Sequence, residues 1–220
     1  MAKTPKELKE LPLMGILRGI KEEQLSQLTE AIIESGLKVV EITMNTSHAP
    51  YLLKRMTNLA SGRLLIGAGT VLNRTDLFDA LEAGAGFIVT PSIVKDVAEY
   101  CYLNSIPVFP GALTPTEIHT AWQMGAAMVK VFPASAFGPK YFKEILAPFN
   151  EIELMAVGGI TDTNIAEYFS MGASAIAFGA SVFKKEYLDA NRYDAIVQDI
   201  KKLIAAWQIT KNKPLNLIQP

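Results

Sequence analysis

The clearest signal of the architecture lies in residues 124–132, which read Met124-Gly125-Ala126-Ala127-Met128-Val129-Lys130-Val131-Phe132. A glycine just past a helix can take the left-handed conformation that ends it. The β-branched run that follows predicts a buried strand. The same order of helix end, glycine and strand recurs at Ser35-Gly36-Leu37, Ala83-Gly84-Ala85 and Met171-Gly172-Ala173. The chain therefore predicts an internal repeat with a period of two β/α units.

Short β-favouring runs and longer segments of helical period alternate along the whole chain. The expected strands are 13–17, 39–43, 64–68, 87–90, 107–109, 128–132, 153–157 and 175–178. Helices are expected between and after them, among others at 22–35, 75–83, 115–124, 163–171 and 193–207.

This order predicts an α/β fold, a closed (β/α)8 or TIM barrel. We expect one domain over residues 1–210 with a short N-terminal helix, followed by a tail at 211–220. The alternative is a doubly wound open sheet, which usually has fewer strands.

The composition narrows the classes of function. The chain has 220 residues, half of them hydrophobic, and a formal net charge of −1. Without a long basic run, a nucleic-acid or membrane partner is not expected. The single cysteine, Cys101, excludes an intrachain disulfide and favours a reducing, cytoplasmic location. No apolar run is long enough to span a bilayer.

The four glycines also set the register of the strands. Five residues beyond them lie Glu41, Val89, Lys130 and Ala177. One interior layer of a TIM barrel takes its four side chains from alternate strands, so we expect these to point inward. Seven residues beyond the glycines, one layer nearer the rim, lie Thr43, Pro91, Phe132 and Gly179.

Lys130 and Glu41 are the candidate catalytic residues. Two opposite charges in an apolar layer are costly unless they are paired or functional. Burial favours the neutral amine of a lysine, and a neutral amine can form a Schiff base with a ketone. A carboxyl nearby can transfer protons. The alternatives are an ion pair that only stabilises the barrel or, for Glu41, an outward-facing side chain.

Small residues follow the last two strands and predict a phosphate site. These are Gly158-Gly159 after the seventh strand and Gly179-Ala180-Ser181 after the eighth. Loops at these positions of a TIM barrel commonly bind phosphate through backbone N–H groups. Glycine lets the backbone approach the anion closely. Turns also need glycine, so each loop alone is weak evidence.

Two further polar residues follow strands at the same end. Thr70 can donate a hydrogen bond to a substrate carboxylate, or alternatively cap the next helix. Arg18, after the first strand, can bind a carboxylate or phosphate through two hydrogen bonds, or form a rim salt bridge. The two histidines, His48 and His119, have no metal-ligand spacing, so no metal site is predicted.

Several motifs occur together in chain order. They are Val40-Glu41-Ile42-Thr43, Gly67-Ala68-Gly69-Thr70, Thr90-Pro91, Phe109-Pro110-Gly111, Lys130-Val131-Phe132-Pro133 and Gly158-Gly159-Ile160. This combination resembles the 2-dehydro-3-deoxy-phosphogluconate/4-hydroxy-2-oxoglutarate (KDPG/KHG) aldolase family over nearly the whole chain.

The resemblance implies a class I aldolase that needs neither metal nor cofactor. Lys130 would form the Schiff base and Glu41 would transfer protons, with Thr70 near the pyruvate carboxylate. Gly158, Gly159 and Ser181 would surround the phosphate. The implied substrate is 2-dehydro-3-deoxy-6-phosphogluconate or 2-dehydro-3-deoxy-6-phosphogalactonate, cleaved to pyruvate and glyceraldehyde 3-phosphate. A further implied substrate is 4-hydroxy-2-oxoglutarate, and the implied assembly is a homotrimer.

The chain departs from the gluconate-type pattern at two positions. Asn45 stands where those enzymes usually carry an arginine, and Val157 stands where they often carry a threonine. These residues, with segments 17–20 and 135–139, are more similar to the phosphogalactonate branch. Arg18 is then the candidate to replace the missing arginine.

Two other classes of function remain open from the residues alone. A phosphate-binding barrel isomerase or synthase would share the glycine loops but need no imine. A catalytically silent barrel would act as an interaction module. Only the aldolase requires a covalent bond between Lys130 and a keto acid.

Overall fold

A computed structural model of the chain describes residues 3–212. Its strands form one parallel sheet in the order β5-β4-β3-β2-β1-β9-β8-β7-β6. The strands are β1 (Leu13–Leu17), β2 (Val39–Thr43), β3 (Leu65–Gly69), β4 (Ile88–Val89), β5 (Val108–Phe109), β6 (Gly111–Ala112), β7 (Val129–Val131), β8 (Leu154–Val157) and β9 (Ala175–Phe178). Three of them coincide with the expected ranges, and the others except β6 differ from them by one residue at one or both ends.

The fifth barrel strand continues past the expected range of 107–109 and is interrupted at Pro110. Proline has no backbone N–H, so the hydrogen-bond ladder is interrupted at this residue. On one side, the backbone N–H of Thr90 donates to the carbonyl of Phe109 at 3.2 Å. On the other side, the N–H of Lys130 donates to the carbonyl of Pro110 at 2.9 Å. Together β5 and β6 therefore act as one barrel strand that closes the sheet, and the (β/α)8 prediction is confirmed.

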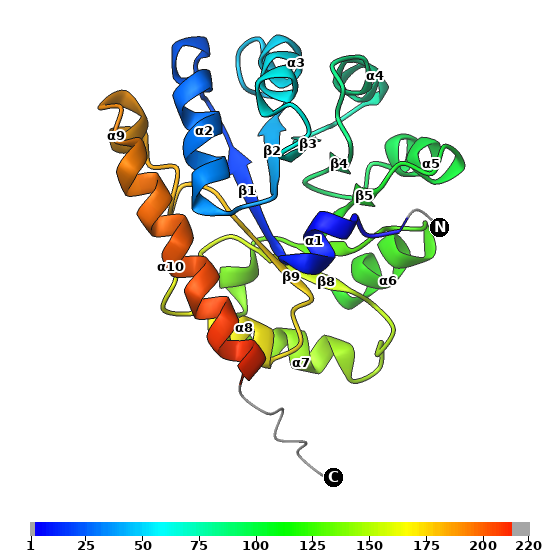
Figure 1. Ribbon diagram of the computed structural model, residues 1–220. Helices are drawn as coiled ribbons and strands as arrows, with labels where there is room; N and C mark the ends of the chain where they lie inside the picture. The colour runs from blue at the N-terminus through cyan, green and yellow to red at the C-terminus, as the bar shows by residue number, and fades with distance from the viewer. Residues whose placement is uncertain (1–2, 213–220) are drawn as a thin grey trace.

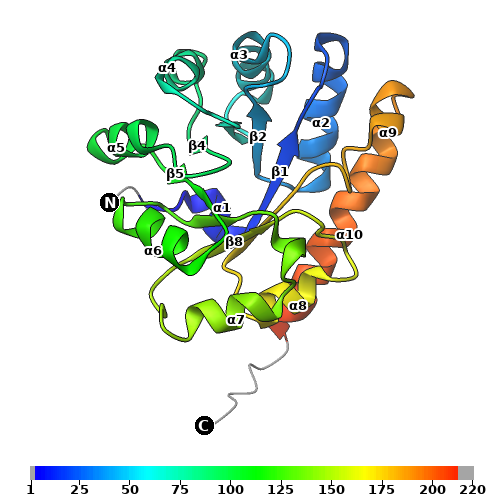
Figure 2. The same cartoon turned by 180° about the vertical axis from the view of Figure 1, so that it is seen from behind.

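Helices surround the sheet on the outside (Figures 1 and 2). They are α1 (Lys6–Glu10), α2 (Leu25–Ser35), α3 (Ala49–Ala60), α4 (Arg74–Glu82), α5 (Lys95–Leu103), α6 (Pro115–Gln123), α7 (Lys140–Leu146), α8 (Ile165–Ser170), α9 (Lys185–Asp189) and α10 (Tyr193–Asn212), with short 3-10 turns at η1 (Glu22–Gln24) and η2 (Ala134–Ala136). The last helix is five residues longer than expected and includes Lys211 and Asn212. The rest of the predicted tail, residues 213–220, lies outside the described residues.

The glycine repeat has the predicted geometry. Gly36, Gly84, Gly125 and Gly172 have φ angles of 87°, 94°, 85° and 98°. These angles lie in the left-handed region that glycine occupies without strain. Each glycine therefore ends a helix and leads the chain into the next strand of the barrel.

The molecule has two apolar cores. The larger lies between the sheet and the surrounding helices. The smaller fills the barrel and includes Val89 and Ala177, as the register predicted. Helix α1 closes the barrel at the N-terminal ends of its strands, and Leu8 of this helix belongs to the inner cluster. No helix in the described part of the chain is both long and apolar enough to cross a membrane.

Candidate active site

Lys130 and Glu41 both point into the barrel. Lys130 lies at the centre of β7 and is 7% exposed, and Glu41 lies at the centre of β2 and is 1% exposed. The Nζ atom of Lys130 lies 5.3 Å from the centroid of the Phe132 ring, which is on the next inward-facing position of the chain. An outward-facing Glu41 is thus excluded, and the two charges share the interior with apolar side chains.

The carboxyl of Glu41 has no direct partner among residues 3–212. Its Oε2 atom is buried and accepts no hydrogen bond from any described residue. Within residues 3–212, no lysine or arginine nitrogen lies within 4.0 Å of this carboxyl. Desolvation raises the pKa of Glu41 above its ordinary value of 4.5, and the charges of Lys130 and Arg18 act against that rise. A raised pKa favours the protonated carboxyl, which can donate a proton to a reacting group.

Gly69, the last residue of β3, determines where the Glu41 carboxyl can lie. A Cβ atom at this position would overlap the Oε1 and Cδ atoms of Glu41. The carboxyl therefore packs directly on the backbone of β3. The sequence motif that contains Gly69 drew attention to its neighbour Thr70, and the role of the glycine was missed.

Thr70 and Arg18 meet at the rim above Glu41. The Nη2 atom of Arg18 donates to the Oγ1 atom of Thr70 at 3.5 Å. Thr70 does not cap the next helix, because Asn73 is the N-cap of α4 and accepts from the backbone N–H of Asp76. A rim salt bridge of Arg18 is also absent from the described residues. Its guanidinium is therefore available for an anion beside Thr70.

A buried pair of threonines supports the loop that carries Arg18. The hydroxyls of Thr43 and Thr46 lie 3.0 Å apart, and Thr46 Oγ1 accepts from the backbone N–H of Gly19 at 3.0 Å. This network links the end of β2 to the loop after β1. Thr46 was missed by sequence reasoning, because its partner at Gly19 lies 27 residues away.

The Gly158-Gly159 loop follows β8 with φ angles of 100° and 76°. The side chain of Asn164 holds the loop by donating to the carbonyl of Gly159 at 2.9 Å. A Cβ atom at position 159 would lie 2.7 Å from the Cβ atom of Ser135, which belongs to the neighbouring loop after β7. The two loops are therefore closely packed, and backbone rather than side chain faces the rim here.

The turn after β9 contains Gly179 and Ser181. The carbonyl of Gly179 accepts from the N–H groups of Val182 and Phe183, and Ser181 is half-buried. This turn and the Gly158-Gly159 loop follow adjacent strands, because β8 pairs with β9. The two predicted phosphate-binding segments are thus brought together at the same end of the barrel as Thr70.

The remaining predicted site residues lie around the same opening. Val157 is buried on the inner face of β8, and it pairs in register with Ala177. Pro91 packs against β6, because a Cβ atom at Gly111 would overlap the carbonyl oxygen of Pro91. Asn45 is exposed in the turn after β2.

Every predicted site residue therefore lies in or directly after a barrel strand. The arrangement places an amine and an unpaired carboxyl in a closed interior. Hydrogen-bond donors for anions lie at the rim above them. Such a set can bind a keto acid, form an imine with it and move protons around the imine.

Comparisons with known proteins agree with this chemistry. The family model for aldolases described as "KDPG and KHG aldolase" matches residues 5–199. The chain belongs to this family. The 2-dehydro-3-deoxy-6-phosphogalactonate aldolase of Escherichia coli (strain K12) is 35% identical over 175 residues, which is 79% of this chain and 85% of that enzyme.

Two solved structures extend the comparison. The one named "Native KDPGal structure" has a TM-score of 0.88 and 30% identity, and the match covers 97% of this chain and 100% of that one. A KDPG aldolase from Legionella pneumophila, with pyruvate captured as a covalent carbinolamine intermediate, has a TM-score of 0.83 and 26% identity over 90% of this chain and 96% of that one.

The resemblance drawn from the motifs is therefore confirmed. This KDPG/KHG-family protein is a class I aldolase, a lyase that acts through a covalent enzyme intermediate. The interpretations as an isomerase or synthase without imine chemistry and as a silent interaction module are set aside.

Proposed function

We propose that the protein cleaves a 2-dehydro-3-deoxy-6-phospho sugar acid to pyruvate and glyceraldehyde 3-phosphate, with Lys130 as the Schiff-base residue and Glu41 as the proton-transfer residue. The observation that carries this proposal is the pair itself. An amine and a carboxyl without a hydrogen-bonded partner share the barrel interior. A purely structural pair would be expected to make a direct ion pair, because unpaired buried charge is costly.

In the proposed mechanism, the neutral amine of Lys130 attacks the C2 ketone of the substrate. Glu41 donates a proton as water leaves, and a protonated imine results. The imine accepts the electron pair of the C3–C4 bond as that bond breaks, and the C4 hydroxyl gives its proton to the Glu41 carboxylate, directly or through water. Glyceraldehyde 3-phosphate leaves, Glu41 protonates the enamine directly or through water, and hydrolysis releases pyruvate and the lysine.

The two ends of the substrate are proposed to bind at opposite sides of the opening. Thr70 and Arg18 would bind the carboxylate next to C2. The backbone N–H groups of Gly158 and Gly159, with Ser181, would bind the phosphate. Binding energy far from C3–C4 would then orient the bond that breaks.

The galactonate epimer is the proposed preferred substrate. The Escherichia coli relative at 35% identity carries the phosphogalactonate name. The exposed Asn45 lacks the positive charge that gluconate-type enzymes place there, and the guanidinium of Arg18 can supply it. Val157 presents a methyl group where a threonine hydroxyl would hydrogen-bond a sugar hydroxyl.

Reduction of the imine tests the proposal directly. Pyruvate plus borohydride should add a stable pyruvyl mass to the peptide that contains Lys130, and mass spectrometry would locate it. Lys130→Met should abolish the adduct. Lys143→Met, on the exposed surface of α7, is the matched control and should label like the wild type. An adduct on another lysine, or none, would overturn the proposed mechanism.

Both epimers and 4-hydroxy-2-oxoglutarate should be assayed side by side. The latter keeps the keto acid and the C4 hydroxyl but has no phosphate. We expect it to be cleaved with a much higher KM, because the glycine loops contribute nothing to its binding.

The proposed assembly is a homotrimer that works in the cytoplasm. Phe137 is 59% exposed and stacks on Tyr141 with a centroid separation of 4.9 Å, an apolar surface suited to a second copy. Light scattering should give three times the chain mass of 24.0 kDa. A monomer at micromolar concentration would contradict the trimer, and recovery outside the cytoplasmic fraction would contradict the location.

A further inference from the structure

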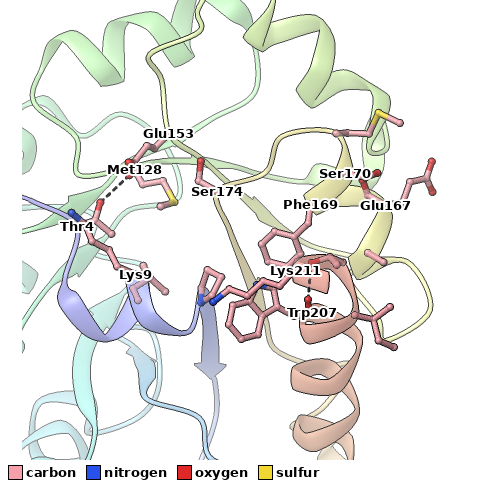
Figure 3. Close-up of a pocket in the computed structure, with 16 residues that line it drawn as sticks. Thr4, Lys9, Met128, Glu153, Glu167, Phe169, Ser170, Ser174, Trp207 and Lys211 are labelled. Atoms are coloured by element: carbon pink, nitrogen blue, oxygen red, sulfur yellow. Dashed lines mark hydrogen bonds between the residues drawn. The ribbon is translucent and has the colours of Figure 1, made fainter. Parts of the chain in front are cut away.

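A large cavity lies at the opposite end of the barrel from Lys130. It has a volume of about 1150 Å³ and lies between α1, α8 and the last turns of α10 (Figure 3). None of the predicted site residues lines it. The apolar residues that line it are Leu8, Pro12, Met128, Ala166, Phe169, Met171, Trp207 and Ile209.

The wall formed by α10 is strongly apolar. The rings of Phe169 and Trp207 lie side by side at its base, and the side chain of Lys211 folds back over Trp207 with its Nζ atom 4.4 Å from the ring centroid (Figure 3). Ile209 is 58% exposed beside them. Trp207 itself is only 8% exposed, so Ile209 is the strongly exposed apolar side chain of this wall. An apolar cavity with such a side chain beside it is a candidate binding surface.

The charged residues that line the cavity are balanced in sign. They are two lysines, Lys9 and Lys211, and two glutamates, Glu153 and Glu167. The cavity therefore has no preference for a strongly charged ligand. An apolar segment with few charges suits it better.

The chain itself supplies such a segment. Helix α10 ends at Asn212, and the residues just before it line the cavity. Residues 213–220 read Lys-Pro-Leu-Asn-Leu-Ile-Gln-Pro, with three aliphatic side chains in eight residues. Pro214 has no backbone N–H and disfavours a continued helix. Eight extended residues reach roughly 26 Å, which is enough to cross the cavity.

We propose that residues 213–220 bind in this cavity of their own chain through Leu215, Leu217 and Ile218. Attachment at the rim gives the segment an effective concentration on the order of millimolar, which favours it over free ligands and over a second copy. The bound segment would cover Ile209, which is 58% exposed.

Disulfide trapping tests the proposal. In a Cys101→Ala background, Asn216→Cys in the segment is paired with Ser170→Cys, an exposed residue at the cavity. Asn58→Cys on α3, which lines a separate shallow groove, is the matched control. Mild oxidation should give an intrachain disulfide at least about tenfold faster with Ser170→Cys than with the control.

Non-reducing electrophoresis and peptide mapping separate the outcomes. Equal rates with both partners, or no disulfide with Ser170→Cys, would overturn the proposal. Disulfides formed only between chains would also overturn it and would point to exchange of the segment between copies.

Deletion of residues 213–220 gives an independent measurement. The melting temperature should fall by about 5 °C, since apolar contacts are lost. Replacing Leu215, Leu217 and Ile218 by serine should reproduce this fall, and replacing Asn216 and Gln219 by serine should not. An unchanged melting temperature after deletion would overturn the proposal.

Discussion

The two ends of the barrel differ in whether their buried polar groups are hydrogen-bonded. At the N-terminal end, the buried hydroxyl of Thr4 lies 2.9 Å from the carbonyl of Ala127 and 3.0 Å from Glu153 Oε2, and Leu8 fills the interior at 1% exposure. At the C-terminal end, Glu41 has a buried oxygen without a partner among the described residues. The contacts at the N-terminal end therefore stabilise the fold. The C-terminal end keeps a destabilising carboxyl where a substrate can use it, and such a loss of stability in favour of activity is common at active sites.

The sharpest test of this contrast is Lys130→Met. Loss of the nucleophile should lower kcat by at least about 10⁴-fold. Methionine has a similar length and no charge to desolvate, so the melting temperature should stay equal or rise. Steady-state kinetics and thermal unfolding measure the two effects. If the variant unfolded at much lower temperature, Lys130 would be a structural residue.

Glu41→Gln should lower kcat by roughly 10²- to 10⁴-fold, because an amide cannot transfer the proton. Imine trapping by pyruvate and borohydride should decline far less than turnover. Equal activity of the variant and the wild type would contradict the proposed role of Glu41.

The effect of Glu41→Gln on the free energy of unfolding should depend on pH, in a direction set by the pKa of Glu41. The folded chain raises the pKa of Glu41 above 4.5, so it binds the proton more tightly than the unfolded chain. Wild-type stability therefore falls as the pH rises from about 4.5 through the folded pKa. Glu41→Gln removes that loss, and its advantage in unfolding free energy should grow above pH 4.5. An advantage that shrinks as pH rises would show that the folded pKa is lowered.

Gly69→Ala should displace the Glu41 carboxyl, because the added Cβ overlaps it. We expect kcat to fall about 10- to 100-fold, since a small misplacement of a catalytic group is costly. Gly67→Ala is the matched control on the same strand, where a Cβ would overlap the Phe87 ring instead. It should lower the melting temperature and leave kcat nearly unchanged. Equal loss of kcat in both variants would mean that the effect is general distortion of β3.

Leu8→Ala probes the other end of the barrel. The cavity it leaves should cost about 2–4 kcal/mol of unfolding free energy. Turnover at 25 °C should change less than about twofold, because Leu8 belongs to the inner cluster below Lys130. Denaturant unfolding and kinetics measure both quantities. A large loss of kcat in a folded Leu8→Ala enzyme would show that the two ends are coupled.

The smallest expected effect is a change of epimer preference. Val157→Thr adds one hydroxyl to the inner face of β8, and the ratio of kcat/KM should move about 10-fold toward the gluconate epimer. Competition between the two epimers measures that ratio directly. An unchanged ratio would place the discrimination elsewhere at the rim.

Local patterns were enough to predict the elements and their inward faces. The five-residue spacing from the helix-ending glycines predicted that Glu41 and Lys130 lie on the interior side of their strands, and the structure has them there. The prediction worked because side chains alternate with a period of two along a strand, so one reference residue sets all the others. The motifs around these residues also predicted the family.

Contacts between distant segments could not be read in the same way. The overlap of Gly69 with Glu41 depends on how β2 and β3 pair, and the bond from Gly19 to Thr46 joins two loops. The division of the fifth strand at Pro110 depends on pairing with β4 and β7. Nothing in the local pattern near these residues indicates such partners.

By itself, the sequence determined the barrel, the inward register and the identity of the two reacting groups, because these follow from periodicity and residue chemistry. Only the tertiary structure decided that the carboxyl of Glu41 has no partner in the described part of the chain, that Arg18 reaches Thr70, and that a cavity opens beneath α1 beside Trp207. Those features depend on distances across the closed barrel, and a distance between segments far apart in the chain is set by the packing of all the elements between them.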